Sequence, residues 1–179
     1  MAGRLPARIF ATGFPARPKN VLPPWNNSAP NTMEVQKDFK ELLTSFNAHG
    51  VEYVIVGGYA LAFHGAPRFT GDLDLFINPT LANARRILAA LTKFGFGGVE
   101  LSAEDFQRPD HVVQLGVPPV RVDIVTSIDG VTWPEAWHGK VAGTYGDVTV
   151  HYLGRVQFVA NKSATGRHKD KADLEALGE

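Results

Sequence analysis

The pattern of apolar and polar positions switches between helix-like and strand-like spacing along most of the chain. Apolar residues recur every three or four positions over residues 34–49 and 81–94, as on one face of a helix. The runs VEYVIV (51–56) and DLDLFI (72–77) are rich in β-branched and aromatic residues, which is typical of strands. The chain after residue 33 therefore begins as helix, strand, helical turn, strand, helix.

Turn signals divide the second half of the chain into paired strands and then helices. The turn-forming sequences GVPP and GD each separate two apolar runs and predict hairpin-like pairs. The further expected elements are short helices at 59–64 and 103–106, strand pairs at 111–115 with 120–125 and at 141–145 with 148–152, and helices at 155–163 and 169–177. This order predicts an α/β (α+β) domain with a mixed central sheet flanked by helices.

Composition and charge exclude several classes of protein. Hydrophobic residues make up 44% of the chain, and 18 basic residues balance 18 acidic ones. This balance argues against a protein that holds nucleic acid mainly through overall charge. The absence of cysteine excludes disulfides, thiol catalysis and cysteine-ligated metals. The longest apolar run, Val54 to Phe63, is far short of the roughly 20 residues that cross a bilayer, so we expect a cytoplasmic protein with no membrane partner.

The first 32 residues differ from the rest of the chain. They contain four basic residues, no acidic residue and six prolines, without apolar periodicity. Such a segment buries too little surface to offset its ordering entropy, so residues 1–32 are predicted to be a disordered tail before one domain at 33–179. Three interpretations stay open: an extension without function, a true start at Met33, or a targeting peptide that lacks the usual Ser-rich pattern and secretory apolar region.

Two aspartates on one predicted strand are the first candidates for chemistry. Alternation along a strand places Asp72 and Asp74 on the same face, about 7 Å apart, with Leu73 and Leu75 facing the core. Two neighbouring carboxylates repel each other, and a divalent cation such as Mg²⁺, which prefers oxygen ligands, removes that cost. The same spacing is also common on solvated strand edges and turns, so it is weak evidence alone.

A glycine pair and a third aspartate complete the candidate site. Gly57 and Gly58 follow a buried strand and open a short helix, which exposes backbone N–H groups suited to a phosphate; a plain turn is the structural alternative. Asp123 lies in the apolar strand RVDIV and needs either a metal or a salt bridge, for instance with Arg121. Together the three features indicate phosphoryl transfer with two metal ions.

Residues 56–77, VGGYALAFHGAPRFTGDLDLFI, resemble the signature of the DNA polymerase β-type nucleotidyltransferase superfamily: a glycine pair, a spacer, then acid–apolar–acid. Here 13 residues separate Gly58 from Asp72, and Asp123 matches the third carboxylate on a later strand. The resemblance implies two Mg²⁺ ions on catalytic Asp72, Asp74 and Asp123, a triphosphate cradled by Gly57 and Gly58, and Asp123 as the first candidate for the general base. It implies an enzyme that transfers a nucleoside monophosphate from an NTP, such as ATP, to an acceptor hydroxyl or phosphate and releases pyrophosphate.

Residues 161–177 resemble the downstream motif of AbiEii-type and MenT-type nucleotidyltransferases, the enzyme halves of toxin–antitoxin pairs. The matching positions are Lys162, Arg167, Lys169, Asp170 and Asp173. Lys169 departs from the motif, which usually has Arg at this position, and the chain is more similar to bacterial stand-alone nucleotidyltransferases of unassigned role than to any toxin. A toxin role would imply an antitoxin partner. The three cations could neutralise phosphates, and the structural alternative is a helix face with Lys–Asp pairs.

Three residues between the glycines and the aspartates are further candidates for nucleotide contacts. Tyr59 adjoins the glycine pair, Arg68 either touches a phosphate or holds its loop, and Thr70 is expected to order the turn before the strand. The acceptor stays open among an RNA or tRNA end, a protein side chain and a small hydroxylated compound. A non-catalytic module that binds nucleotide or a partner protein is the alternative to an enzyme.

Overall fold

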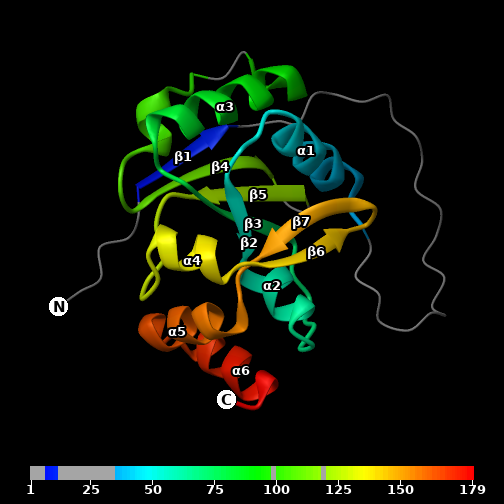
Figure 1. The fold of residues 1–179 in the computed structure, drawn as a ribbon, viewed down its shortest axis with the longest axis vertical. Coiled ribbons are helices and arrows are strands. Elements are labelled where there is room, and N and C mark those ends of the chain that lie inside the picture. Colours follow the sequence, from blue (N-terminus) through cyan, green and yellow to red (C-terminus); the bar gives the residue numbers. More distant parts are fainter. Residues whose placement is uncertain (1–6, 12–34, 98–99, 118–119) are drawn as a thin grey trace.

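One mixed sheet forms the centre of the fold. The computed structural model describes residues 7–11, 35–97, 100–117 and 120–179 (Figure 1). The strands of this described part are β1 (Ala7–Ala11), β2 (Tyr53–Val56), β3 (Asp72–Ile77), β4 (His111–Val117), β5 (Val120–Val125), β6 (Val141–Tyr145) and β7 (Val148–Tyr152). Their order across the sheet is β1-β4-β5-β3-β2-β7-β6. Three neighbouring pairs, β1–β4, β3–β5 and β2–β7, are parallel and the others antiparallel, which confirms the predicted mixed sheet.

Helices cover the sheet on both sides. They are α1 (Lys37–Ala48), α2 (Gly57–Phe63), α3 (Leu81–Leu91), α4 (Trp133–Gly139), α5 (Arg155–Thr165) and α6 (His168–Leu177). In Figure 1, α1 and α3 lie on one side of the strands, and α4, α5 and α6 lie on the other. None of the helices in the described part of the chain has the length and apolarity needed to cross a membrane.

Two helical segments differ from the prediction. The helix expected to reach residue 94 ends as α3 at Leu91 and continues as a π-helical turn, Thr92–Phe96, in which Gly95 has φ +112°. Helix α4 was not expected as an element; it carries two tryptophans, Trp133 and Trp137, four residues apart. Their rings stack, with centroids 5.3 Å apart, and Phe76 of β3 meets Trp133 edge-on. Both differences arise where tertiary packing outweighs a short local pattern.

The N-terminal segment is partly structured, in contrast to the prediction of a disordered tail over residues 1–32. Ala7–Ala11 form strand β1, which pairs in parallel with β4. Backbone hydrogen bonds to a sheet edge stabilise a strand of five residues that has no periodicity of its own. The rest of that prediction concerns residues 1–6 and 12–34, which lie outside the described residues.

The central strands separate an apolar face from a charged face. On β3 and β5, the side chains of Leu73, Leu75, Val122 and Ile124 are fully buried on the side that packs into the core. The charged residues that alternate with them point to the opposite side: Asp72, Asp74, Arg121 and Asp123. The alternation predicted for β3 is therefore confirmed, and it places the candidate site on one face of the middle of the sheet.

Candidate active site

Strand register brings the three predicted carboxylates together. On the parallel pair β3–β5, Asp74 lies opposite Asp123 and Asp72 lies opposite Arg121. Residues in register on adjacent strands point to the same side, about 4.8 Å apart. On the next strand, the buried side chain of Gln114 lies opposite Asp123 and extends the polar row. Sequence reasoning missed Gln114, although a single polar residue within the apolar run HVVQLGV was a usable signal.

The glycine pair lies directly against this face. Gly57 follows β2 with φ +63°, a backbone conformation that side chains rarely allow. A Cβ atom at Gly57 would overlap the carboxylate of Asp74. A Cβ atom at Gly58 would lie 2.8 Å from Cβ of Thr70. The two glycines therefore let the turn after β2 approach Asp74 of β3 and Thr70 closely.

Replacing Gly57 with alanine is expected to destabilise the fold for two reasons that a matched variant separates. The left-handed backbone alone costs an alanine roughly 1–2 kcal/mol, and the overlap with Asp74 adds to it. Gly50 has the same φ of +63°, but a Cβ atom there would have nothing within 4 Å, so Gly50→Ala should show the backbone cost only. Urea unfolding of both variants should give a larger loss for Gly57→Ala; equal losses would contradict the close contact with Asp74.

Asp74 is the most strongly perturbed carboxylate of the site. Burial, which is the largest effect, together with the charges of Asp123 and Asp72, raises the pKa of Asp74 from an ordinary value of 3.8 to about 7. The charges of Lys169 and Lys162 act in the opposite direction. A raised carboxyl pKa among like charges is typical of functional sites. Ionisation of all three aspartates is therefore unfavourable unless a cation lies close to them.

The raised pKa of Asp74 predicts a pH-dependent gain in stability for Asp74→Asn. In the unfolded chain Asp74 ionises near 3.8, whereas in the fold it ionises near 7, so the native protein loses stability as pH rises between these values. Asparagine carries no such cost. In EDTA, the stability of the variant relative to the unsubstituted protein should grow by about 2–3 kcal/mol from pH 5 to pH 8.

Thermal unfolding at both pH values measures this difference, with Asp147→Asn as the control. Asp147 is exposed, and its hydrogen bond from Lys40 lowers its pKa. It is therefore ionised in both the folded and the unfolded chain at the two pH values, and this substitution should give the same small change in stability at pH 5 and at pH 8. An unchanged difference between the Asp74 variant and the unsubstituted protein at the two pH values would show that Asp74 ionises normally.

Arg121 lies between two of the three carboxylates. Its guanidinium contacts Asp72, and its Nε lies 3.2 Å from Oδ1 of Asp123 without the alignment of a hydrogen bond. Three carboxylates on one face are the donor type that Mg²⁺ prefers. As they stand, however, no three His, Cys, Asp or Glu side chains in the described part of the chain are placed to hold a metal ion. The three predicted ligands thus suit Mg²⁺, because they are carboxylates and lie on the same face of the sheet. Two of them, Asp72 and Asp123, are in contact with Arg121.

A buried network of charged side chains joins α5, α6 and the loop before β3. Nζ of Lys162 lies 2.7 Å from Oδ1 of Asp170 and 2.9 Å from Oδ2 of Asp173, and all three side chains are buried. Arg68 donates hydrogen bonds to both oxygens of Asp173 at 2.7 and 3.2 Å. Arg167 donates to Asp170. Lys162 and Arg167 thus pair with aspartates, as the structural alternative proposed, but they do so around the buried carboxylates of Asp170 and Asp173 rather than on a solvated helix face. Arg68 bonds Asp173 of α6 rather than only its own loop.

The two buried aspartates stay ionised within this network. Burial alone would raise the pKa of Asp170, but hydrogen bonds from Arg167 and Lys162 outweigh it and hold this pKa well below its usual range. Hydrogen bonds from Arg68 and Lys162 likewise lower the pKa of Asp173 against the effect of burial. Asp170 and Asp173 therefore carry negative charges at neutral pH.

The same network lies close enough to the carboxylates of the sheet to act on them electrostatically. Lys169 and Lys162 lower the pKa of Asp74, and the charge of Asp74 adds to the effect of Asp170 in raising the pKa of Arg167. Lys169 and Arg167 are exposed, whereas Lys162 is buried. Phosphate contacts by these three residues stay a prediction, and the exposed pair has the better access to a ligand.

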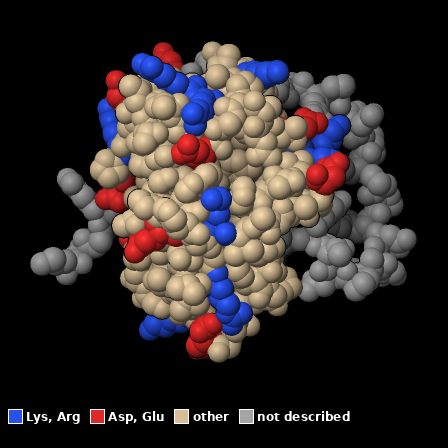
Figure 2. Space-filling view, in the orientation of Figure 1, with Lys and Arg blue, Asp and Glu red and all other residues tan. Residues whose placement is uncertain are grey.

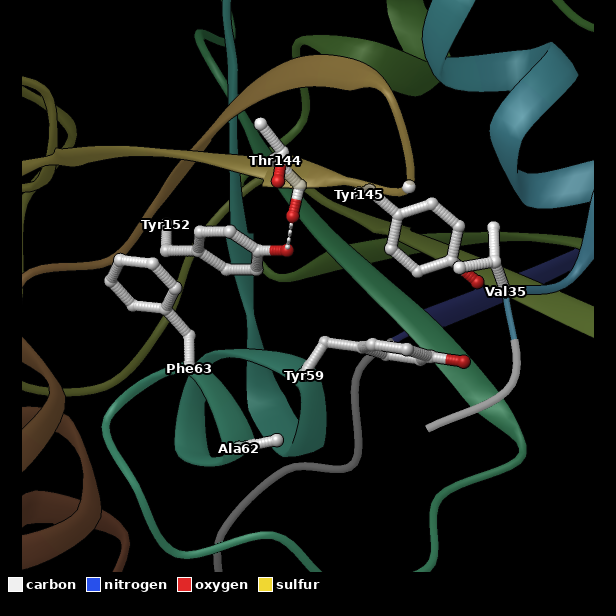
Figure 3. A pocket seen from close by; sticks show the side chains of 8 residues that line it. Val35, Tyr59, Ala62, Phe63, Thr144, Tyr145 and Tyr152 are labelled. Atoms are coloured by element: carbon white, nitrogen blue, oxygen red, sulfur yellow. Dashed lines mark hydrogen bonds between the residues drawn. The ribbon is translucent and has the colours of Figure 1, made fainter. Parts of the chain in front are cut away.

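Thr70 and Tyr59 frame the glycines on two sides. Thr70 donates a hydrogen bond to the backbone oxygen of Asp72 at 3.3 Å, in line with the expected role in the turn. Tyr59 lines a hollow of about 220 Å³ between α2 and the β6–β7 hairpin (Figure 3). Other aromatic walls come from Phe63 and Tyr152, which stack with centroids 4.3 Å apart, and from Tyr145. Burial raises the pKa of Tyr59, a hydrogen bond with Tyr145 acts in the opposite direction, and Tyr152 and the charge of Asp72 raise this pKa further. The effect of Asp72 indicates that the hollow adjoins the acidic face.

The fold and this face define a protein of the nucleotidyltransferase fold class. The crystal structure of a "putative nucleotidyltransferase" from Thermotoga maritima superimposes with a TM-score of 0.52 and 16% identity, over 76% of this chain and 88% of that one. The model of the family described as "Nucleotidyl transferase of unknown function (DUF2204)" matches residues 35–179, and the chain belongs to that family. No curated protein matches the chain.

Proposed function

We propose that the chain is a nucleotidyltransferase that moves a nucleoside monophosphate from an NTP to an acceptor hydroxyl or phosphate and releases pyrophosphate. The family and the fold support nucleotidyl transfer in general terms. The finer assignment, to metal-dependent transfer on Asp72, Asp74 and Asp123, is supported by the geometry of one face of the sheet. ATP is the first nucleotide to test.

One observation carries the proposal: Asp74 lies in register with Asp123 and in contact with the turn at Gly57. Segments from three separate parts of the sequence thereby meet at one point. Nucleotidyl transfer requires a triphosphate beside carboxylates, because charge neutralisation and positioning supply most of the catalysis. Position 57 requires glycine both for its φ of +63° and for the close approach to Asp74.

The protein groups have distinct roles in this proposal. Asp72, Asp74 and Asp123 would hold the Mg²⁺ ions, which supply charge neutralisation for the phosphates and a polarised acceptor oxygen. Backbone N–H groups around Gly57 and Gly58 would orient the triphosphate. Asp123 is the candidate to accept the proton of the acceptor hydroxyl. The exposed cations Arg167 and Lys169 and the ring of Tyr59 would contact the nucleotide, while Lys162, Arg68 and Thr70 position the surrounding loops.

The overall charge balance, 18 basic against 18 acidic residues, favours a compact acceptor. On the face shown in Figure 2, Lys and Arg side chains are interspersed with Asp and Glu and separated by uncharged surface, rather than gathered in one basic band. This distribution favours a short RNA or tRNA end, a protein side chain or a small hydroxylated compound over a long nucleic-acid footprint. Kinship with the AbiEii-type and MenT-type enzymes, and an antitoxin partner, are part of this proposal and rest only on the motif at residues 161–177.

Labelled NTPs tested against three kinds of acceptor would reveal the substrate. The protein should be incubated with each NTP, radiolabelled at the α-phosphate, and with total tRNA, cell protein or aminoglycosides in the presence of Mg²⁺. Label in one acceptor fraction, dependent on Mg²⁺, is the expected result. Label in none of them would count against catalysis and favour a module that only binds a nucleotide or a partner protein.

A further inference from the structure

Arg121 is placed where a cation would be expected among the three carboxylates. It lies two residues before Asp123 on β5 and directly across from Asp72 on β3. Its guanidinium contacts Asp72 on one side and Asp123 on the other. The side chain is 22% exposed, so the guanidinium is largely shielded from water. The site therefore carries one positive charge of its own.

From this arrangement we infer that Arg121 competes with a divalent cation for Asp72 and Asp123. A carboxylate oxygen that binds a guanidinium is not free to bind a metal ion in the same direction. A guanidinium a few ångströms from a divalent cation also repels it in a poorly solvated site. Metal binding therefore requires Arg121 to leave the two carboxylates. The inference rests on the proposed function in one respect: that function names Asp72 and Asp123 as metal ligands.

The contact on the Asp123 side is suited to release. Nε of Arg121 lies 3.2 Å from Oδ1 of Asp123, within ion-pair distance, but it makes no aligned hydrogen bond. Arginine contacts to carboxylates are strong chiefly when two aligned N–H groups meet two oxygens. Loss of this contact is therefore less costly than loss of the hydrogen bond that Arg121 donates to Asp72, and the Asp123 side is where a metal ion would first displace the guanidinium.

Manganese binding to the full-length protein without nucleotide tests the competition. Isothermal titration with Mn²⁺ should give about tenfold or tighter binding for Arg121→Met than for the unsubstituted protein, because one repelling charge is removed and two carboxylates are released. Arg86→Met is the matched control. Arg86 forms an ion pair with Glu52 at 3.3 Å, outside the group of three aspartates, and its replacement changes the net charge by the same amount. Asp123→Asn added to Arg121→Met should abolish the gain.

The outcomes separate this inference from the proposed function. Mn²⁺ affinity in Arg121→Met that equals or falls below that of the unsubstituted protein would overturn the competition. The same holds if Arg86→Met gives an equal gain, since net charge alone would then explain it. Failure of the proposed function would appear in a different experiment, as the absence of α-phosphate label on any acceptor. Tighter Mn²⁺ binding by Arg121→Met can be observed whether or not label is transferred.

A second measurement needs no destabilising change, should Arg121→Met fail to fold. Proton–nitrogen NMR spectra resolve arginine Nε–H groups, and Arg121→Lys identifies the Arg121 signal by its disappearance. Addition of Mg²⁺ to the unsubstituted protein should shift this signal and speed its exchange with water as the guanidinium leaves the carboxylates. A signal that does not change at Mg²⁺ concentrations that saturate the site would overturn the inference.

Discussion

Replacement of Lys162 with methionine is expected to lower the free energy of unfolding by about 3 kcal/mol, because removal of one partner from a buried ionic group leaves the others poorly compensated. Lys162 bonds Asp170 and Asp173, whose side chains are 0% and 2% exposed. Each aspartate keeps one arginine partner, Arg167 or Arg68, which limits the loss. Methionine has a similar length, so little volume is lost.

Urea denaturation at pH 7 measures this loss, and Lys169→Met is the matched control. Lys169 is exposed on α6 near the same network, and surface substitutions usually change stability by less than about 0.5 kcal/mol. If both variants lose the same small amount, the Lys162 network does not stabilise the junction of α5 and α6. The result also assigns roles, since a residue committed to two carboxylates is not available as a phosphate ligand.

The double substitution Asp72→Asn with Asp74→Asn is expected to reduce nucleotidyl transfer by about a thousandfold or more. Metal ions contribute several kcal/mol to such reactions, and each 1.4 kcal/mol corresponds to about a factor of ten in rate. The asparagines keep the shape of the side chains but remove the charge that binds the metal. The rate of α-phosphate label transfer to the acceptor is the quantity to measure.

Loss of activity in this variant is separable from loss of structure. The pKa of Asp74, raised to about 7, predicts that neutralisation of this group stabilises the protein above neutral pH. The double variant should thus unfold no more readily than the unsubstituted protein at pH 8 while its activity is lost. Retention of NTP-dependent labelling in a folded double variant would rule out the metal mechanism.

The strand pattern of the site could be predicted from sequence because alternation is a local property. DLDLFI forms β3 over the predicted residues 72–77, and the hairpin at 141–145 and 148–152 also forms at its predicted bounds. The glycine pair and the acidic pair were likewise predicted to meet. In these segments, local propensity and tertiary packing favour the same structure.

The contacts of charged side chains could not be predicted in the same way, because they depend on which elements become neighbours. The sequence offered Arg121 as one of several partners for Asp123, but only the register of β3 with β5 shows that Arg121 also reaches Asp72. In the same way, the pairing of Lys162 with Asp170 and Asp173 depends on the packing of α5 against α6. Charge spacing alone fits a phosphate site and an internal network equally well.

Separate labels on the two ends of one nucleotide test the central claim most directly. The protein is incubated with Mg²⁺ and its best acceptor, once with NTP labelled at the α-phosphate and once with NTP labelled at the γ-phosphate. Nucleotidyl transfer on Asp72, Asp74 and Asp123 predicts that the α-label joins the acceptor while the γ-label is released as pyrophosphate. Transfer of the γ-label instead, or transfer of neither label, would contradict the account.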